Sequence, residues 1–287
     1  MSDLLRCILT VKCPDKKGIV AAVSTYLFDQ GVAITEASQC DEGGAFFMRM
    51  VFECAGEGGS DAVTSSLREG FAAIAQAFDM EWSIQDAALK PRVLIAVSRF
   101  GHCLNDLLHR WRTGQLPVEI VAVVSNHDDM RSLVEWHGLP YFHLPVTKGA
   151  KEQQETEFLA LVDRFSADLV VLARYMQILS PTMCAALNGR CINIHHSFLP
   201  SFKGAKPYHQ AHARGVKIIG ATAHYVTTDL DEGPIIEQGI HRISHAYTAE
   251  QLVEVGQDVE CTVLARAVKW HAEQRVMLSG QKTVVFA

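Results

Sequence analysis

The sequence lacks a long apolar run, an excess of basic residues and a leader-like start. A membrane helix needs about 20 apolar residues, whereas the best run, 169–173, is enclosed by Asp168 and Arg174. The 26 Lys and Arg residues are outnumbered by 32 Asp and Glu, and the net charge of -6 argues against nucleic acid or an anionic membrane as a partner. Residues 1–6 lack a basic segment followed by an apolar one, so no signal peptide is expected. These features predict a soluble cytoplasmic protein.

Closely spaced cysteine pairs are also missing. None of the eight cysteines forms a C-x-x-C pair, and most lie inside apolar runs. An even number is compatible with disulfides, as in small secreted chains, but a chain of 287 residues can bury a large core without them. Reduced thiols are therefore the favoured interpretation.

The hydrophobic pattern divides the chain into two predicted domains. Residues 1–86 alternate short strands and helices in the order βαββαβ, which predicts two helices on one face of an antiparallel sheet, a ferredoxin-like fold. Residues 87–91 form the expected linker. The expected strands are 4–11, 32–39, 45–53 and 81–85, and the expected helices are 19–28 and 62–78.

Residues 92–287 show buried strands separated by helices, which is typical of a doubly wound, mostly parallel α/β sheet of the Rossmann-like kind. Ligands of such sheets bind beyond the carboxyl ends of the strands. A capping box at Thr248 and Gln251 predicts a final helix that extends to Gln274. The expected strands are 92–97, 118–124, 139–144, 169–172, 190–194, 218–227 and 234–242, with helices over 103–111, 129–137, 152–165 and 209–214.

One polar segment follows a predicted buried strand of this domain. Asn193 and His195 alternate onto the same side of the strand 190–194 where it ends. An amide donor and an imidazole placed together can stabilise a tetrahedral oxyanion and transfer a proton. The alternative is that both side chains only satisfy backbone groups of the loop.

Three acidic residues, Asp229, Asp231 and Glu232, gather in a second polar segment, 224–234. A carboxylate from this loop that faces Asn193 and His195 would act as a general base or orient a water molecule. The three groups would then promote attack of water on an acyl carbon without a metal or a covalent intermediate. The simpler interpretation of the acidic segment is a solvated turn. Motifs of serine hydrolases, zinc proteases, P-loops and dinucleotide-binding folds are absent.

Two further interpretations remain open. His195, His196, His209, His212 and His224 lie close in sequence, and a helix would place His209 and His212 on one face. No compact ligand signature accompanies them, so a metal is not expected. Residues 176–179 would by default begin a core helix.

The motif Asn193-x-His195, the segment 197–204, His224 and Asp231-x-Gly233 resemble the formyltransferase domain of enzymes that use 10-formyltetrahydrofolate. Across its whole length the chain is similar to the formyltetrahydrofolate deformylase family. Pro14-Asp15-x-x-Gly18-Ile19-Val20 resembles an ACT module, a small regulatory unit that commonly pairs between subunits and binds amino acids. Further matching segments are 102–108, 125–127, 173–181 and 204–210.

The resemblance implies an ACT regulatory and oligomerisation domain over 1–86 and a catalytic domain over 92–287. It implies hydrolysis of 10-formyltetrahydrofolate to tetrahydrofolate and formate, with Asn193 donating to the oxyanion, His195 stabilising it and assisting proton transfer, and Asp231 positioning or deprotonating the water. It also implies no cofactor, no metal, a homo-oligomer (dimer or tetramer) and an amino-acid effector. The residues expected to bind substrate are Arg174, Tyr175, Met176, Gln177, Ile178, Leu179, His224, Thr227 and Thr228.

One departure separates hydrolysis from transfer. Relatives that formylate phosphoribosylglycinamide have a glycine-rich phosphate loop after the first strand, whereas residues 98–102 here carry bulky side chains and a single glycine. Water is therefore the expected acceptor. The alternatives are formyl transfer to an amine and a folate or amino-acid sensor that lacks catalysis.

Overall fold

The computed structural model describes residues 4–56, 58–147, 149–196 and 207–287. Its contacts separate two compact units. The small unit comprises the chain up to Lys90 together with Glu273–Ser279 and Val284–Ala287, and the large unit comprises Pro91–Ala272 with Gly280–Thr283. All eight cysteines are free, in agreement with the expectation of reduced thiols.

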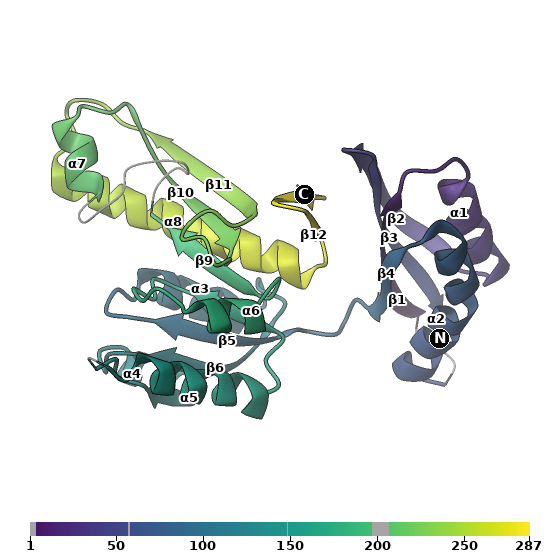
Figure 1. Ribbon diagram of the computed structural model, residues 1–287, viewed down its shortest axis with the longest axis horizontal. Coiled ribbons are helices and arrows are strands. Elements are labelled where there is room, and N and C mark those ends of the chain that lie inside the picture. Colours follow the sequence, from purple (N-terminus) through teal and green to yellow (C-terminus); the bar gives the residue numbers. More distant parts are fainter. Residues whose placement is uncertain (1–3, 57, 148, 197–206) are drawn as a thin grey trace. The chain divides into compact units, whose positions relative to one another are not determined.

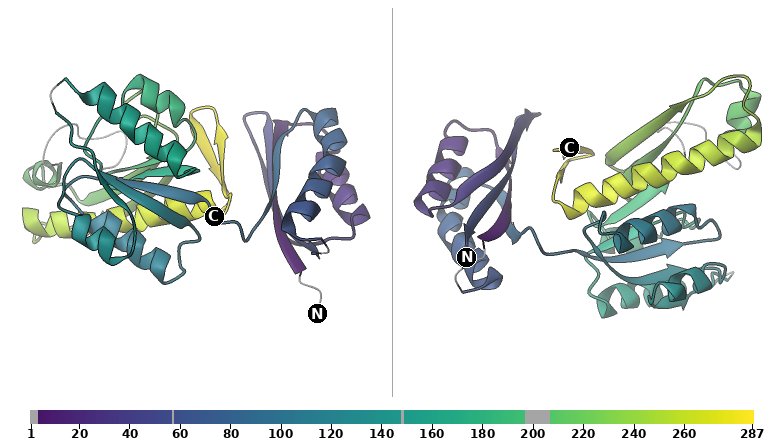
Figure 2. Two further views of the ribbon diagram at one scale, coloured as in Figure 1. Left: turned by 90° about the horizontal axis from the view of Figure 1, so that it is seen from below. Right: turned by 180° about the vertical axis from the view of Figure 1, so that it is seen from behind.

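The small unit has the predicted βαββαβ order. Its four strands pair antiparallel in the order β2-β3-β1-β4, and α1 and α2 lie on the same face of this sheet (Figures 1 and 2). Gly43 and Gly44 form the hairpin turn between β2 and β3 with positive φ angles of 64° and 81°, which glycine adopts without steric cost. The elements are β1 (Leu4–Pro14), α1 (Ile19–Asp29), β2 (Ala33–Glu42), β3 (Ala45–Ala55), α2 (Ser60–Phe78) and β4 (Glu81–Asp86).

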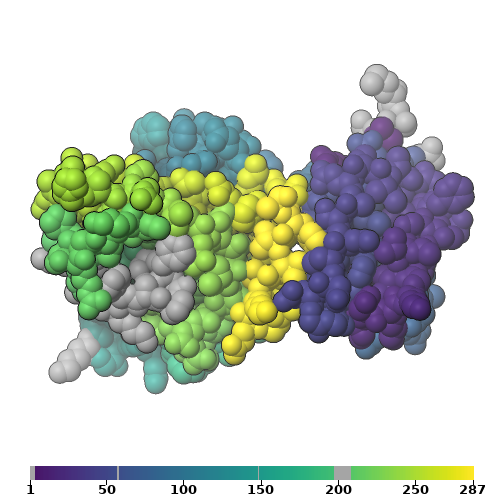
Figure 3. All heavy atoms as spheres, turned by 90° about the horizontal axis from the view of Figure 1, so that it is seen from above, coloured from purple at the N-terminus to yellow at the C-terminus, as the bar shows by residue number. Residues whose placement is uncertain are grey.

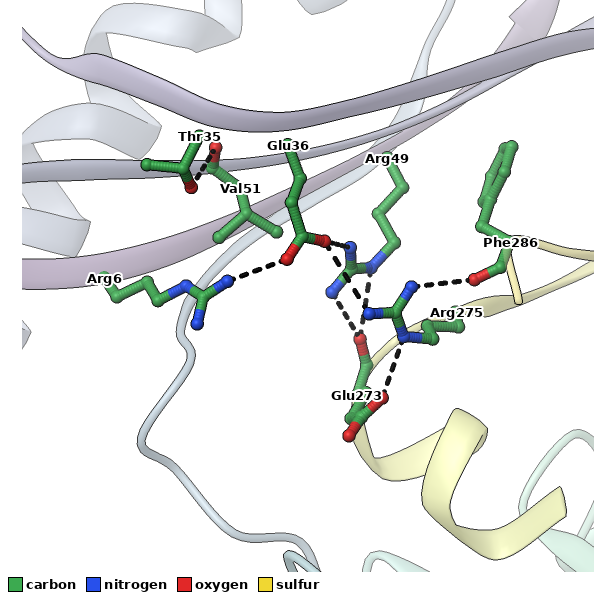
Figure 4. A network of polar contacts seen from close by, with 8 residues as sticks. All are labelled: Arg6, Thr35, Glu36, Arg49, Val51, Glu273, Arg275 and Phe286. Atoms are coloured by element: carbon green, nitrogen blue, oxygen red, sulfur yellow. Dashed lines mark hydrogen bonds and ion pairs between the residues drawn. The ribbon is translucent and has the colours of Figure 1, made fainter. Parts of the chain in front are cut away.

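Two C-terminal segments, Glu273–Ser279 and Val284–Ala287, group with the small unit, whereas the sequence alone predicts that they belong to the domain over 92–287. Arg49, only 5% exposed, donates from Nε and Nη2 to the carbonyl of Glu273 at 3.2 and 3.0 Å (Figure 4). Its Nη1 donates to Glu36 at 3.0 Å, and Arg275 lies 3.6 Å from the same carboxylate. A buried guanidinium needs such acceptors, so this polar network fixes the C-terminal segment, which also forms the unexpected strands β12 (Val276–Ser279) and β13 (Lys282–Val285).

The large unit is built on the predicted mostly parallel sheet. Its strand order is β11-β10-β9-β8-β5-β6-β7, in which β10 runs antiparallel to both of its neighbours and the remaining pairs are parallel. Side chains of α5 and α6 form a core with β5, β6 and β8 on one face, while α3 packs against α8. The elements are β5 (Arg92–Val97), α3 (His102–Arg112), β6 (Glu119–Ser125), α4 (Arg131–Trp136), β7 (Tyr141–His143), α5 (Lys151–Arg164), β8 (Leu169–Leu172), α6 (Pro181–Ala186), β9 (Cys191–His195), α7 (Pro207–Ala213), β10 (Ile218–Tyr225), β11 (Ile235–Arg242) and α8 (Ala249–Ala272).

Helix α8 begins at the predicted capping box, in which Thr248 N donates to Gln251 Oε1 at 2.9 Å and Gln251 N donates to Thr248 Oγ1 at 3.3 Å. The helix ends at Ala272, slightly before the expected Gln274. Helix α7 lies against α8, as the green and yellow-green atoms show (Figure 3). Across the described ranges, no helix is both long and apolar enough to cross a membrane.

The default expectation of a helix beginning within 176–179 is wrong, because these residues form a loop after β8. Met176 and Ile178 are 52% and 61% exposed. The helix α6 begins later because Ser180 caps it, its Oγ accepting a hydrogen bond from Met183 N at 3.2 Å, and Pro181 occupies the first turn. The polar loop thereby remains beyond the carboxyl end of β8.

Candidate functional site

A cavity of about 240 Å³ lies beyond the carboxyl ends of β8 and β9. The three expected catalytic residues and the nine expected substrate-binding residues all line it. The sequence segment 197–204, which carries part of the motif, lies outside the described residues. The other lining residues are Leu172, Cys184, Ile194, His196, Val226, Asp229 and Leu230.

The register of β9 and β10 places Asn193 beside His224. The amide Nδ2 of Asn193 lies 3.2 Å from His224 Nε2, and His224 Nδ1 lies 2.9 Å from the carbonyl of Tyr225. Because a carbonyl only accepts, His224 Nδ1 donates to it, and Nε2 faces the amide of Asn193. This bond fixes which way the Asn193 amide faces and leaves its second N–H to donate toward the cavity.

Asp231 joins the two imidazoles. Its Oδ2 lies 3.2 Å from His195 Nδ1, and its Oδ1 lies 3.7 Å from His224 Nε2. Burial acts to raise the pKa of Asp231, but its interactions with His195 and His224 outweigh the burial and hold that pKa well below its ordinary value. The carboxylate is therefore ionised, and it leaves Nε2 as the nitrogen of His195 that can exchange a proton with a ligand.

The loops on both sides of the cavity hold strained backbone. Asp231 and Arg174 have φ angles of 59° and 64°, in the left-handed region where a residue other than glycine costs about 1–3 kcal/mol. Gly233 is required for a different reason: a Cβ there would lie 1.8 Å from the carbonyl oxygen of Tyr225. Tyr225 N donates to the carbonyl of Pro234 at 2.9 Å, so Gly233 allows the loop to return closely beside β10 with Asp231 over the cavity.

Arg174 lines the cavity, and its guanidinium also belongs to a buried polar network. Its Nη1 donates to His196 Nδ1 at 2.9 Å, and its Nε lies 3.4 Å from Glu260 Oε2. Glu260, 1% exposed, also accepts from the Tyr208 hydroxyl at 2.7 Å and lies 2.8 Å from His102 Nε2. Although burial acts to raise the pKa of Glu260, its bonds with His102, Arg174 and Tyr208 lower it. The network therefore contains an ionised pair.

Tyr175, the next residue of this loop, is largely buried. Its ring is 5% exposed, and its hydroxyl accepts from Gln154 Nε2 at 2.8 Å. Burial raises the pKa of Tyr175 to about 12. Tyr175 therefore anchors the loop 174–179 in the core and presents only a small part of itself to the cavity.

Sequence reasoning missed Glu260, although the spacing along α8 contains a signal. Leu252, Gly256, Glu260 and Leu264 recur every four residues, and all four are buried, so Glu260 is an acid on an apolar helix face. A Cβ at Gly256 would lie 2.2 Å from Tyr208 Cζ. The ring of Tyr208 therefore packs directly on the helix and directs its hydroxyl to Glu260.

His102, Cys103 and Glu260 bring possible metal ligand atoms within 4.8 Å of one another, the one such group among the residues that the structure describes. Both oxygens of Glu260 already have partners, and the guanidinium of Arg174 lies beside it. A cation at this position repels a metal ion. The arrangement fits a charge pair better than a metal centre.

A second contact from α8 holds the end of β10. The Tyr225 hydroxyl forms a hydrogen bond of 2.7 Å with His271 Nδ1. Burial lowers the pKa of His271 to about 4, and burial together with the nearby Arg174 lowers the pKa of His196 to about 4. Both imidazoles are therefore neutral in the folded protein.

The free energy of unfolding is expected to decrease as the pH falls from about 6.5 to 4, because each of these histidines binds a proton in the unfolded chain before it does so in the folded one. For His271 alone the loss between pH 7 and 5 is about 2 kcal/mol. Urea unfolding of the His271→Asn variant, which keeps an acceptor for Tyr225, should show a pH dependence smaller by that amount. The exposed His245→Asn control should keep the full dependence, and an unchanged dependence in His271→Asn would contradict the assignment.

Comparisons with known proteins agree with this fold. The sequence model of the formyl transferase family matches residues 91–268. A formyltetrahydrofolate deformylase from Corynebacterium sp. (strain P-1) is 50% identical over 287 residues, covering 99% of each chain. The crystal structure of a formyltetrahydrofolate deformylase from Burkholderia mallei matches with a TM-score of 0.93 and 53% identity, covering 99% of this chain and 100% of that one.

Solved transferases resemble a smaller part of the chain. A glycinamide ribonucleotide transformylase from Symbiobacterium toebii matches with a TM-score of 0.65 and 28% identity, and it covers 69% of this chain and 95% of its own. The similarity to the deformylases, in contrast, includes both units. The chain belongs to the formyltetrahydrofolate deformylase family.

Proposed function

We propose that this protein is a hydrolase that converts 10-formyltetrahydrofolate and water to tetrahydrofolate and formate. The observation that carries the proposal is the grouping of an amide, an imidazole and an ionised carboxylate, those of Asn193, His195 and Asp231, at one cavity. Close relatives named formyltetrahydrofolate deformylase support the choice of substrate.

The two loops that line the cavity hold the pterin ring, largely through backbone groups. These loops are 174–179, beyond β8, and 227–231, beyond β10. Met176, Ile178 and Leu230 are each more than half exposed and offer apolar surface to a flat ring. The side chains of Gln177, Leu179, Thr227 and Thr228 complete the expected binding set.

In the reaction, an oxygen of water attacks the formyl carbon and the carbonyl becomes an oxyanion. The N–H of Asn193 and the protonated imidazole of His195 stabilise that oxyanion. His195 takes one proton of the attacking water, and the resulting imidazolium gives it to N10 of the folate as the C–N bond breaks. The formic acid that forms loses its remaining proton to the solvent and leaves as formate, with tetrahydrofolate as the second product. No cofactor and no metal enters these steps.

Asp231 acts mainly by orienting the imidazole and the water. A carboxylate whose pKa lies well below the ordinary range is a weak base. Its negative charge, 3.2 Å from His195 Nδ1, stabilises the imidazolium that forms during proton transfer and fixes the ring orientation.

The loop after β5 supports water as the acceptor. The Ser98 hydroxyl donates to Asn126 Oδ1 at 2.7 Å and accepts from Met176 N at 2.9 Å, so it ties this loop to the cavity wall. A Cβ at Gly101 would lie 2.4 Å from Met130 Sδ, which shows that side chains already pack against the single glycine. Phe100 is 54% exposed at a position where a phosphate would need close backbone approach.

Incubation with 10-formyltetrahydrofolate and no amine should release formate and tetrahydrofolate in equal amounts. The two products are measured separately, by a coupled formate assay and by absorbance. Added phosphoribosylglycinamide should leave the rate unchanged and remain unformylated. An absolute requirement for an amine acceptor would replace hydrolysis with formyl transfer.

We also propose that the small unit acts as an ACT module. Its βαββαβ order and its strand order β2-β3-β1-β4 support an assignment that the motif at 14–20 suggested. In this role it pairs subunits into a homo-oligomer, a dimer or a tetramer, and binds an amino-acid effector. The protein acts in the cytoplasm, without nucleic-acid or membrane partners.

A further inference from the structure

We propose that Glu260 is a positioning residue for His195, acting through Arg174 and His196. The inference deepens the proposed function, since His195 is the imidazole assigned there to proton transfer. Glu260 itself lies on α8 and is absent from the cavity lining.

The first of three contacts that link Glu260 to His195 is the ion pair of Glu260 with Arg174. The Arg174 side chain is 12% exposed and that of Glu260 is 1% exposed, with 3.4 Å between Nε and Oε2. A buried guanidinium is stable only with a negative partner. Nε of Arg174 is buried and has no hydrogen-bond partner among the described residues, so at this atom the guanidinium depends on the charge of Glu260.

The second contact fixes His196. An arginine only donates, so the bond of 2.9 Å from Arg174 Nη1 makes Nδ1 of His196 an acceptor. The ring is therefore neutral, with its proton on Nε2. The lowered pKa of His196 agrees with this tautomer.

The third contact reaches the catalytic imidazole. The rings of His195 and His196 are stacked with centroids 4.7 Å apart and planes inclined by 24°. Asp231 fixes His195 in its own plane through Nδ1, and His196 limits rotation of the ring from one face. Because catalysis is sensitive to a misplacement of about 1 Å, support on the face matters as much as the hydrogen bond.

The wall of the cavity does not depend on the same contacts. Ser98 holds the loop 174–179 through its backbone, accepting from Met176 N at 2.9 Å and donating its own N–H to the Arg174 carbonyl at 3.2 Å. Loss of Glu260 should therefore disturb the imidazole stack more than the proposed folate-binding backbone.

The test compares Glu260→Gln with Glu237→Gln. Glu237 on β11 also pairs with an arginine of α8, Arg266, at 2.8 Å, and its side chain is 12% exposed. We expect Glu260→Gln to lower kcat by about 10²-fold while KM for 10-formyltetrahydrofolate changes much less, and Glu237→Gln to keep both values near those of the unmodified protein. Equal kcat values for the two variants, or a loss confined to KM, would overturn the proposal.

A double-substitution cycle separates positioning from folding. Arg174→Met combined with Glu260→Gln removes both buried charges, which costs less stability than leaving one unpaired. If Glu260 acts through Arg174, the double variant should have the same kcat as Arg174→Met alone. If the double variant instead has a kcat lowered by the product of the two single losses, Glu260 acts by another route. The comparison of the double variant with Arg174→Met remains possible even if Glu260→Gln alone does not fold.

Histidine ring spectra provide a readout that is independent of hydrolysis. In the protein labelled with ¹⁵N-histidine, His196, assigned with a His196→Gln variant, should show the neutral Nε2–H form at neutral pH. Glu260→Gln should change this signal and Glu237→Gln should keep it. An unchanged signal in Glu260→Gln refutes the positioning role. If Glu260→Gln changes the signal but the unmodified protein releases no formate, only the proposed function is refuted.

Discussion

Replacing Asp231 with Asn is expected to lower kcat for formate release by about 10²–10⁴-fold, the range attributed to a positioned acid–base group. Asn keeps the size of the side chain but removes the charge that lies 3.2 Å from His195 Nδ1 and 3.7 Å from His224 Nε2. An amide in this position can also hydrogen-bond to the wrong tautomer of His195, as happens when the aspartate of a catalytic triad is replaced.

The measurement is the rate of formate release at saturating 10-formyltetrahydrofolate, with the thermal unfolding temperature recorded for each variant. Glu232→Gln is the matched control, since Glu232 is an exposed acid beside Asp231 that does not line the cavity. The control should retain its activity. A nearly normal rate in Asp231→Asn, or an equal loss in both variants, would remove Asp231 from the mechanism.

Replacing His195 with Ala should reduce kcat by a similar factor of about 10²–10⁴, because the oxyanion loses a donor and the proton loses its route to N10. The side chain of His195 is 12% exposed and its removal leaves space beside the ring of His196. Imidazole added to the solution should therefore restore part of the activity to this variant.

His209→Ala is the informative control for this experiment. His209 is exposed on α7 and belongs to the histidines that the metal-site interpretation would require. Retained activity in His209→Ala agrees with a metal-free reaction. A loss as large as that of His195→Ala, reversed by an added divalent ion, would instead support a metal site.

Much of this arrangement follows from local patterns in the sequence. Period-two alternation places Asn193 and His195 on one side of β9, and the expectation that ligands bind beyond the carboxyl ends of strands directs attention to the edge of the sheet where the cavity lies. The capping box at Thr248 is equally local, and the structure confirms it.

The contacts that sequence patterns did not predict depend on pairing between distant segments. The bond from Asn193 to His224 exists because β10 pairs antiparallel with β9 in one register, and a shift of one residue would turn His224 to the other face. Glu260 lies 86 residues beyond Arg174, and only the tertiary fold brings them together. Arg49 and Glu273 are 224 positions apart, so no local pattern assigns the C-terminal segment to the small unit.

The interleaved order of the two units constrains how this protein can be divided, in the laboratory or during evolution. The last residues of the chain complete the unit that its first 90 residues begin. Removal of the first 90 residues alone would take away Arg49, the buried donor to the Glu273 carbonyl, and would leave the strands β12 and β13 without that contact. A gene exchange that transplants the small unit intact therefore needs two breakpoints rather than one, which favours inheritance of both units together.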